Sequence, residues 1–263
     1  MSEIASHYAG KAERYARFRW DYAPAAIAQI VALAGLRPGD AVADIGAGPG
    51  TLSRWLLTHK LHVWAVEPEA EMRSAAEALL GGHAHFYSRA VEAEATWLPA
   101  ASLRLITVGR ALHWFAPAPA RREFSRILQP DGWLAVLAVR CSDPAVEAAV
   151  KGLATECNGF DLSRHKKSRP AVDLDFYLRP EGRVVLRVPA VQRERWPQFI
   201  GRLSTLSGAP GPGTLGFALL EQAARSVFER FAVDDILTIP VETQVRMGHM
   251  KPSDSTCQGE SDQ

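Results

Sequence analysis

The sequence predicts an α/β fold with a mostly parallel sheet and helices on both faces. Short apolar runs alternate with amphipathic stretches along the first half of the chain, which is typical of successive strand–helix–strand units. A glycine cluster, "GAGPG" at 46–50, follows directly after the first apolar run. An acid, Glu67, ends the second run about 20 residues further on.

Each predicted element rests on a local signal. The first helix begins near Pro24 and ends at Gly35, a residue that commonly stops helices. Later helices show apolar residues at helical spacing, and the strands are short apolar runs bounded by turn residues. The predicted helices cover 24–35, 51–58, 69–80 and 118–128. The predicted strands cover 41–45, 61–67, 83–87, 103–109, 132–139, 183–189 and 233–241.

The alternation of strands and helices breaks after residue 140, which suggests that the chain is divided into a core and additional segments. The last residues are polar and lack periodicity, so we expect them to be disordered. The predicted segments are an N-terminal helical lid (1–35), a cofactor-binding core (36–140), an acceptor-covering insertion (141–230), a final sheet strand (231–247) and a disordered tail (248–263).

Composition restricts the class of protein. The chain has 263 residues, a formal net charge of +1 and 47% hydrophobic residues, which suits one large domain with a sizeable core. The near-neutral charge argues against nucleic acid as the main partner. No apolar run approaches the ~20 residues that span a bilayer, and the first residues are polar where a secretory signal needs an apolar stretch. Three cysteines, Cys141, Cys157 and Cys257, form no disulfide framework. We expect a protein of the reducing cytoplasm.

The glycine cluster predicts a ligand site at one edge of the sheet. Ligands of open parallel sheets bind outside the carboxyl ends of the strands, where the strand order reverses. Glycines let the main chain turn tightly and approach a ligand. The dinucleotide pattern GxGxxG would need a third small residue at 51, which is Thr51. Glu67 has the spacing and the acceptor atoms to bind ribose hydroxyls, so a nucleoside ligand is predicted in either case.

Four stretches in order resemble class I S-adenosylmethionine-dependent methyltransferases. They are "RPGDAVADIGAGPGTLSRWL", "VWAVEPEAEM", "LITVGRALHWF" and "RILQPDGWLAVL". The resemblance is closest to the small-molecule group, methyltransferase type 11, which includes trans-aconitate and ubiquinone-biosynthesis methyltransferases. The segment "YARFRWDYAP" is similar to the "YxxxRPxYP" segment of that group, and Asp44, two residues before the first glycine, favours a methyltransferase over a dehydrogenase. The implied fold is Rossmann-like, with a seven-stranded, mostly parallel sheet.

The resemblance implies a role for particular residues in binding S-adenosylmethionine. Asp44 and the glycine loop would hold the methionine end, Glu67 the ribose, and Pro68 and Met72 the adenine. The implied cofactor-binding residues are Tyr15, Arg19, Tyr22, Asp44, Gly46, Ala47, Gly48, Gly50, Glu67, Pro68, Met72, Ala90, Val91, Arg110 and Ala111.

Three residues just past the fourth predicted strand are candidates for the acceptor side. His113 is the candidate catalytic base, because it titrates near neutral pH and follows a strand at the active edge. It can equally be a structural hydrogen-bonding residue. Trp114 and Phe115 can line an apolar acceptor pocket, or pack against the sheet edge as aromatic residues most often do.

Aromatic residues crowd the N-terminal segment, at Tyr8, Tyr15, Phe18, Trp20 and Tyr22. The spacing of Tyr15, Phe18 and Tyr22 places these three on one helical face. They predict either a packing face or an aromatic lid that excludes water and attracts a sulfonium.

Two further patterns carry weaker signals. His83 and His85 would face the same side of a strand, but without a third ligand they do not indicate a metal site, and none is predicted. The basic run from Arg164 to Arg169 suggests a solvated loop, or less readily a surface that attracts an anionic acceptor.

These observations predict a cytoplasmic, S-adenosylmethionine-dependent methyltransferase. It would move a methyl group to an O, N or C atom of a small-molecule acceptor. No nucleic-acid or membrane partner is predicted, and the chain can be a monomer or a homodimer. The alternatives are an NAD-dependent oxidoreductase and a non-catalytic protein that keeps the cofactor site.

Overall fold

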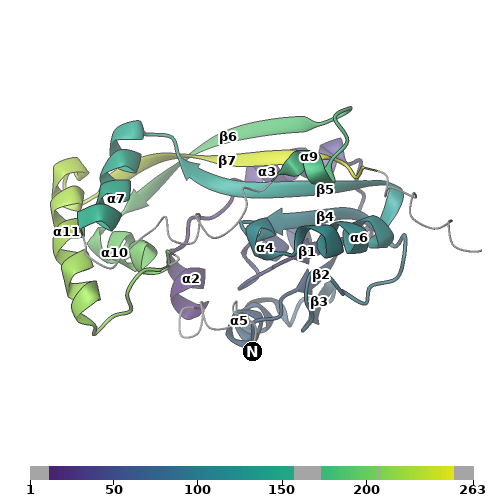
Figure 1. Cartoon of the computed structure of the whole chain (residues 1–263), viewed down its shortest axis with the longest axis horizontal. Coiled ribbons are helices and arrows are strands. Elements are labelled where there is room, and N and C mark those ends of the chain that lie inside the picture. The colour runs from purple at the N-terminus through teal and green to yellow at the C-terminus, as the bar shows by residue number, and fades with distance from the viewer. Residues whose placement is uncertain (1–11, 157–172, 207, 252–263) are drawn as a thin grey trace, which may run out of the picture.

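A computed structural model describes residues 12–156, 173–206 and 208–251 (Figure 1). Tyr8, Cys157, Cys257, the basic run at 164–169 and residues 252–263 of the predicted tail lie outside the described residues. Seven strands form one sheet in the order β3-β2-β1-β4-β5-β7-β6. They are β1 (Ala41–Ile45), β2 (His62–Val66), β3 (Phe86–Arg89), β4 (Leu103–Gly109), β5 (Leu128–Cys141), β6 (Val184–Glu194) and β7 (Leu237–His249).

The sheet is mostly parallel, as the sequence predicts. The pairs β1–β2, β2–β3, β1–β4 and β4–β5 are parallel, whereas β7 pairs antiparallel with both β5 and β6. The strand order reverses between β1 and β4, so the carboxyl ends of these two strands flank the switch point where ligands bind in such sheets.

Helices cover both faces of the sheet (Figure 1). They are α2 (Ala12–Phe18), α3 (Pro24–Leu33), α4 (Thr51–Thr58), α5 (Ala70–Leu80), α6 (Pro117–Ile127), α7 (Pro144–Glu156), α9 (Leu174–Tyr177), α10 (Trp196–Ser204) and α11 (Leu215–Phe231), with a 3₁₀ turn, η1 (Leu112–Trp114). One buried cluster joins α3 and α4 to the sheet, and a second joins α6 to the other face. Apolar burial of this kind is the main stabilising term of an α/β domain.

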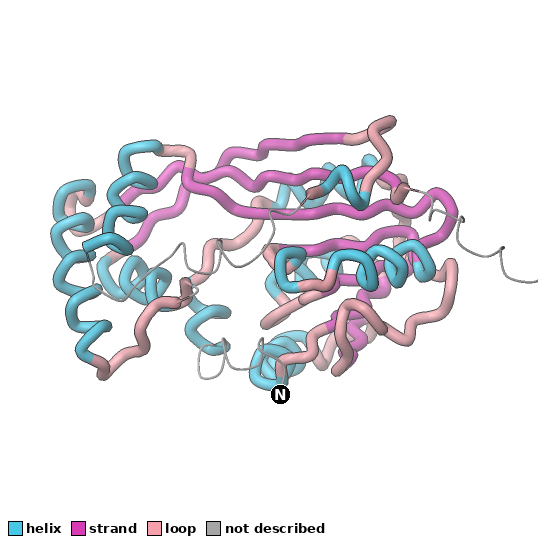
Figure 2. Tube along the Cα trace, viewed as in Figure 1, coloured by secondary structure: helices cyan, strands magenta, loops and turns pink. Residues whose placement is uncertain are grey.

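Strands β5, β6 and β7 are longer than predicted. The antiparallel pairing of β6 with β7 runs from Val184↔Met247 to Glu194↔Leu237, well beyond the parallel core. Beyond the core these strands carry α7, α10 and α11, which share a third buried cluster around Phe199, Leu220 and Phe228 (Figure 2). We call this part, α7, α10 and α11 with the adjoining strand ends, the extension. β6 therefore lies inside the range 141–230 as a strand of the main sheet.

The boundaries of β3 and β7 also differ from the prediction. β3 begins at Phe86 because residues 81–85 form turns, with the His83 amide donating to the Leu80 carbonyl and the Phe86 amide to the His83 carbonyl. β7 continues to His249, so the start of the predicted tail belongs to the sheet.

Helix α3 belongs to the core layer, which leaves only the residues before it free to form a lid. Ile27 and Ile30 are fully buried in the cluster that joins α3 to the sheet. Pro24 occupies the first turn of α3, where its missing amide hydrogen costs no helical bond.

We expect Ile30→Ala to lower the free energy of unfolding by about 2–4 kcal/mol, because it leaves a cavity in a closed core. The matched variant Leu33→Ala removes a side chain of the same helix that is 43% exposed, and it should cost well under half as much. Chemical denaturation of both variants measures the difference. Equal losses would show that α3 does not pack as described.

Candidate functional site

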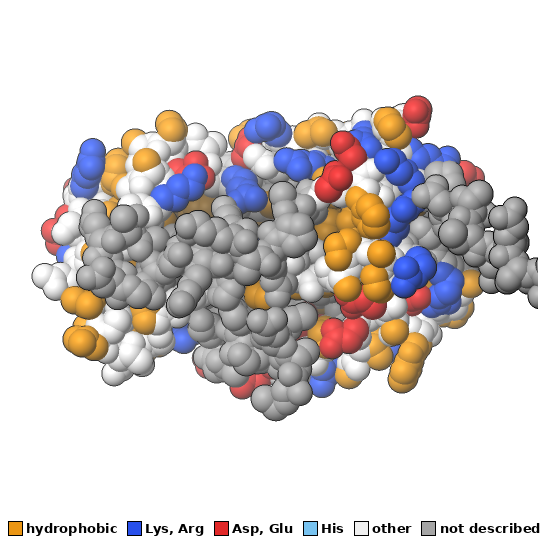
Figure 3. All heavy atoms as spheres, viewed as in Figure 1, with side chains coloured by type: hydrophobic (Ala, Val, Ile, Leu, Met, Phe, Trp, Pro, Cys, Tyr) orange, Lys and Arg blue, Asp and Glu red, His pale blue; other side chains and the backbone are white. Residues whose placement is uncertain are grey.

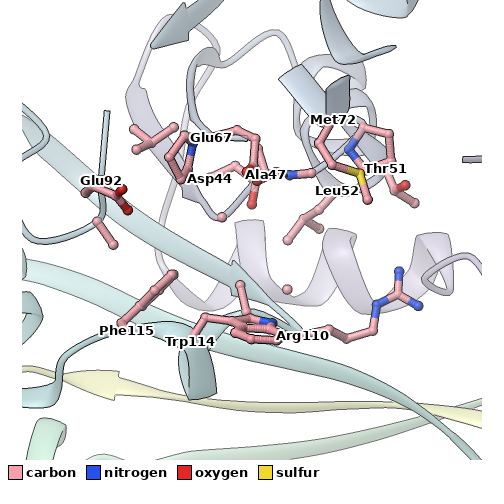
Figure 4. Close-up of a pocket in the computed structure, with 18 of the residues that line it drawn as sticks. Asp44, Ala47, Thr51, Leu52, Glu67, Met72, Glu92, Arg110, Trp114 and Phe115 are labelled. Carbon is pink, nitrogen blue, oxygen red and sulfur yellow. Dashed lines mark hydrogen bonds between the residues drawn. The ribbon is translucent and has the colours of Figure 1, made fainter. Parts of the chain in front are cut away.

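A cavity of about 820 Å³, counting its open mouth, lies at the carboxyl ends of β1, β2 and β4 (Figure 4). This is the switch point of the strand order, where ligands of open parallel sheets bind. Its lining residues are Tyr15, Tyr22, Asp44, Gly46, Ala47, Gly48, Pro49, Thr51, Leu52, Val66, Glu67, Pro68, Met72, Glu92, Ala93, Glu94, Gly109, Arg110, Ala111, Trp114 and Phe115.

The glycine loop forms one wall of the cavity, and two of its glycines have different reasons to be glycine. Gly46 has φ +70°, and a Cβ there would lie 2.4 Å from the Cβ of Ala111. Gly48 has φ +56°, but a Cβ there would meet no atom within 4 Å. The absence of a side chain at Gly46 therefore lets the loop pack closely against Ala111, whereas at Gly48 it leaves open space beside the main chain that a ligand can fill.

Gly50 does not line the cavity. It caps the N-terminus of α4 with φ +81°, and a Cβ there would lie 2.8 Å from Cδ1 of Leu80. The third glycine of the cluster thus lets α5 pack against the start of α4, a role that the sequence pattern does not distinguish from ligand contact.

Glu67 follows β2 and is only 8% exposed. Its Oε2 accepts a hydrogen bond of 2.8 Å from the Gly48 amide, and its Oε1 accepts one of 3.0 Å from the Glu69 amide. Burial raises the pKa of Glu67 to about 7, against the opposing effect of these two hydrogen bonds. Each oxygen keeps a further lone pair, so the carboxylate can still accept from a ligand's hydroxyl groups.

Asp44 lies near the end of β1 and is almost fully buried. Ser53 donates to its Oδ2 over 2.7 Å, and Thr107 donates to its Oδ1 over 3.3 Å. Burial raises the pKa of Asp44 to about 6, and the Ser53 hydrogen bond opposes this rise. The cavity therefore has two buried carboxyl groups on one side, at Asp44 and Glu67 (Figure 4).

One cation, Arg110, lies among the lining residues. It follows β4 with φ +60°, a strained conformation for a residue with a side chain. Its guanidinium carbon lies 4.7 Å from the ring centroid of Tyr22 and 5.8 Å from that of Tyr15. Burial raises the pKa of Tyr22 to about 12, although the neighbouring Arg110 charge acts to lower it.

The Arg110 guanidinium has protein partners only in part. Its Nη1 donates to the Trp20 carbonyl over 3.0 Å. Its Nε is buried without a hydrogen-bond partner, and within the described ranges no carboxylate lies at salt-bridge distance from it. A half-buried cation in this state is suited to an anionic group of a ligand.

Trp114 and Phe115 lie across the cavity from Asp44 and Glu67 (Figure 4). Glu92 approaches from the loop after β3, at the end of the cavity opposite the Arg110 guanidinium in this view. Glu94 is held in place because its Oε1 accepts from the Ala116 amide, at the start of α6, over 2.6 Å.

Five predicted site residues do not line the cavity. The Arg19 Nη2 donates to the Thr205 carbonyl over 3.3 Å, and Gly50 packs against α5 as described above. Ala90 is exposed, and Val91 packs against the buried cluster that joins α6 to the sheet. β3 ends at Arg89, two residues later than predicted, so the loop that follows it also begins later in the chain. His113 is exposed on η1, its ring centroid 5.1 Å from that of Trp114. The functional roles of these five residues stay predictions.

The sequence prediction also missed residues that line the cavity. Glu92 and Glu94 could have been found as acids in the loop after the third strand, had that strand been placed correctly. Six further lining residues have no side-chain chemistry that indicates a ligand site. They line the cavity because they lie next to the predicted residues in the glycine loop and at the strand ends. They are Pro49, Thr51, Leu52, Val66, Ala93 and Gly109.

Comparison with known proteins shows which proteins this chain is similar to in sequence and in fold. Residues 43–136 match the family model described as a methyltransferase domain. An uncharacterized methyltransferase of Mycobacterium tuberculosis is 35% identical over 123 residues, which is 47% of this chain and 48% of the relative; one of Mycobacterium bovis matches equally. The chain thus spans about half the length of the curated relatives it matches.

Solved structures agree on the fold. A protein from Anaeromyxobacter dehalogenans, provisionally assigned as a type II methyltransferase, matches 88% of this chain and 98% of its own with a TM-score of 0.62 and 22% identity. The YcgJ protein of Bacillus subtilis matches 86% of this chain and 98% of its own with a TM-score of 0.51 and 17% identity. The chain therefore has the fold of class I methyltransferases, whose cofactor is S-adenosylmethionine, and its residues 43–136 are similar to a methyltransferase domain. The closer resemblance to trans-aconitate and ubiquinone-biosynthesis enzymes stays a prediction.

The residues present fit this cofactor. The open space beside Gly48 leaves room for a ligand against the main chain, and Glu67 offers acceptors for two hydroxyl groups. The half-buried cation of Arg110, whose Nε has no hydrogen-bond partner, suits a carboxylate. Within the described ranges no cluster of three or more His, Cys, Asp or Glu could hold a metal ion, and no described helix has the length and apolar character to cross a membrane.

Glu67 gives the ligand-free protein a specific dependence of stability on pH. Because its pKa is raised in the folded state, the folded protein binds a proton that the unfolded chain has already lost between about pH 4.5 and 7. The free energy of unfolding therefore falls as pH rises through this window. We expect Glu67→Gln to reduce that slope by up to about 1 kcal/mol per pH unit. Denaturation of both proteins from pH 5 to 8 measures it, and parallel curves would contradict the account.

Proposed function

We propose that this protein transfers a methyl group from S-adenosylmethionine to an O, N or C atom of a small-molecule acceptor. The single observation that carries the proposal is the pairing of Glu67 with Gly48 at the switch point of the sheet. This contact places a carboxylate with spare acceptor positions beside an open stretch of main chain, as a nucleoside ligand requires.

The lining residues suggest how the cofactor lies. Glu67 would accept from both ribose hydroxyls, with Pro68 and Met72 against the adenine. Glu92, which also lines the cavity, would accept from the exocyclic amine of the base. The methionine part would extend toward the opposite end of the cavity, where its carboxylate would meet the Arg110 guanidinium (Figure 4).

The chemistry proposed is an in-line displacement, in which the acceptor atom bonds to the methyl carbon as the carbon–sulfur bond breaks. The cofactor supplies an activated methyl group whose leaving group is a neutral thioether. The protein's part is to exclude water and to align the acceptor at near-attack distance. Tyr15 and Tyr22 would help to exclude water from the cavity, and Trp114 and Phe115 would hold an apolar part of the acceptor.

His113 remains our proposal for the base where an acceptor must lose a proton. Its exposed position beside Trp114 implies that such an acceptor reaches the mouth of the cavity. A small-molecule acceptor is favoured over nucleic acid because the net charge is only +1 and because basic and acidic side chains are both present on the face shown in Figure 3. A cytoplasmic location, a biosynthetic role and a monomeric or homodimeric state belong to the same proposal.

Gly48 provides the sharpest test of cofactor binding. Gly48→Ala should fold, since its Cβ meets no protein atom, but the methyl group should occupy space needed by the ligand. We expect the Kd for S-adenosylhomocysteine to rise at least tenfold by calorimetry. Gly39→Ala is the matched control, because Gly39 also has a positive φ (+91°) and open space around its Cβ but is remote from the cavity.

Both variants should lose a similar, small amount of stability through backbone strain, about 1 kcal/mol. Equal affinities of the two variants would contradict the proposed binding mode. NAD, titrated in parallel, tests the oxidoreductase alternative: binding of NAD but not of S-adenosylhomocysteine would replace the methyltransferase proposal.

The role of Arg110 can be isolated by the choice of ligand. We expect Arg110→Met to weaken S-adenosylhomocysteine binding tenfold or more, because the ligand's carboxylate loses its cationic partner. Binding of methylthioadenosine, which has the same nucleoside but no amino-acid group, should change less than threefold. An equal loss for both ligands would show that Arg110 shapes the cavity without pairing with the carboxylate.

A further inference from the structure

The N-terminal segment connects the extension to the cofactor cavity. On one side, α2 lies against α10, where a Cβ on Gly201 would come within 2.7 Å of the Phe18 ring. On the other side, Asp21 forms an ion pair with Arg54 and accepts from Trp55 Nε1 over 2.9 Å, both on α4. The segment is therefore held at two points, with the cavity between them.

A buried ion pair fixes the extension side of this segment. Glu194, at the end of β6, and Arg202, on α10, are each only 5% exposed. Two nitrogens of Arg202 donate to the two oxygens of Glu194, over 2.7 and 3.0 Å. The indole Nε1 of Trp20 donates to the same Glu194 Oε1 over 2.7 Å, and the Arg202 guanidinium carbon lies 4.2 Å from the centroid of the Trp20 ring.

The other end of Trp20 reaches the cavity. Its carbonyl accepts from Arg110 Nη1 over 3.0 Å, and two residues further on the Tyr22 ring lies over that same guanidinium. A chain of contacts therefore runs from Arg202 through Glu194 and Trp20 to Arg110. We call these four residues the Trp20 relay.

Stability alone gives a weak reason for this arrangement. Burying an ion pair costs desolvation that its attraction only roughly repays, whereas its directional bonds restrict where the bonded groups can lie. In the Trp20 relay, the ion pair restricts the position of Trp20, and the Trp20 carbonyl in turn accepts the hydrogen bond from Arg110, the cation that lines the cavity.

We propose that Glu194 and Arg202, which lie outside the cavity, are positioning residues that set the Arg110 guanidinium for the ligand's carboxylate, acting through Trp20. This inference rests on the proposed function. It links the cofactor site to the extension, so that a change in the extension alters cofactor affinity without touching the cofactor.

The test begins with Trp20→Phe, which keeps an aromatic ring beside Arg202 but removes the N–H group that Glu194 accepts. The expected result is a Kd for S-adenosylhomocysteine five- to twentyfold higher than that of the wild type, and a Kd for methylthioadenosine changed less than threefold. Glu194→Gln, which keeps the shape and removes the charge, should act in the same direction. Trp196→Phe is the control on α10, since its ring contacts Arg225, Phe228 and Phe199, none of which is a relay residue.

A double-mutant cycle separates positioning from a merely structural role. If Trp20 acts through Arg110, Trp20→Phe should have almost no further effect on S-adenosylhomocysteine binding in the Arg110→Met background. An unchanged loss in that background, or wild-type affinity in both relay variants, would overturn this inference alone. Failure of the wild type to bind S-adenosylhomocysteine would overturn the proposed function and the inference with it.

Discussion

The hydrogen bond between Glu67 and the Gly48 amide is the interaction on which the candidate site depends. It ties the loop after β1 to the residue after β2, so two parallel strands fix one wall of the cavity together. The same contact keeps a carboxyl group in an environment that raises its pKa to about 7. A ligand that donates hydrogen bonds to the ionised form would relieve this burial cost, so we expect the site to favour hydroxyl groups over apolar ones.

Much of the core and of its ligand wall could be predicted from the sequence, because local signals decide them. The runs at 41–45 and 103–109 are buried on both faces and bounded by turn residues, so β1 and β4 have the predicted ends. Gly46, Gly48 and Glu67 lie at the sheet edge where the sequence places them and line the cavity there, since strand ends and glycine turns position them with little help from distant residues.

The remaining features depend on contacts between distant segments. The length of β6 and β7 follows from their mutual pairing, which apolar periodicity in either strand alone does not reveal. The displacement of Ala90 and Val91 from the cavity follows from the turns that delay β3. Arg19 and Arg110 are both arginines, so the sequence alone does not show which of them lines the cavity. The fold places Arg110 in the cavity wall, whereas Arg19 donates to the carbonyl of Thr205 at the end of α10.

The central claim is that a nucleoside of the cofactor lies between Glu67 and the glycine loop. A crystal structure of the protein with S-adenosylhomocysteine tests it most directly. The account predicts both ribose hydroxyls within hydrogen-bond distance of the Glu67 carboxylate and the ligand's carboxylate on the Arg110 guanidinium. A ligand bound elsewhere, or bound here with its ribose away from Glu67, would contradict it.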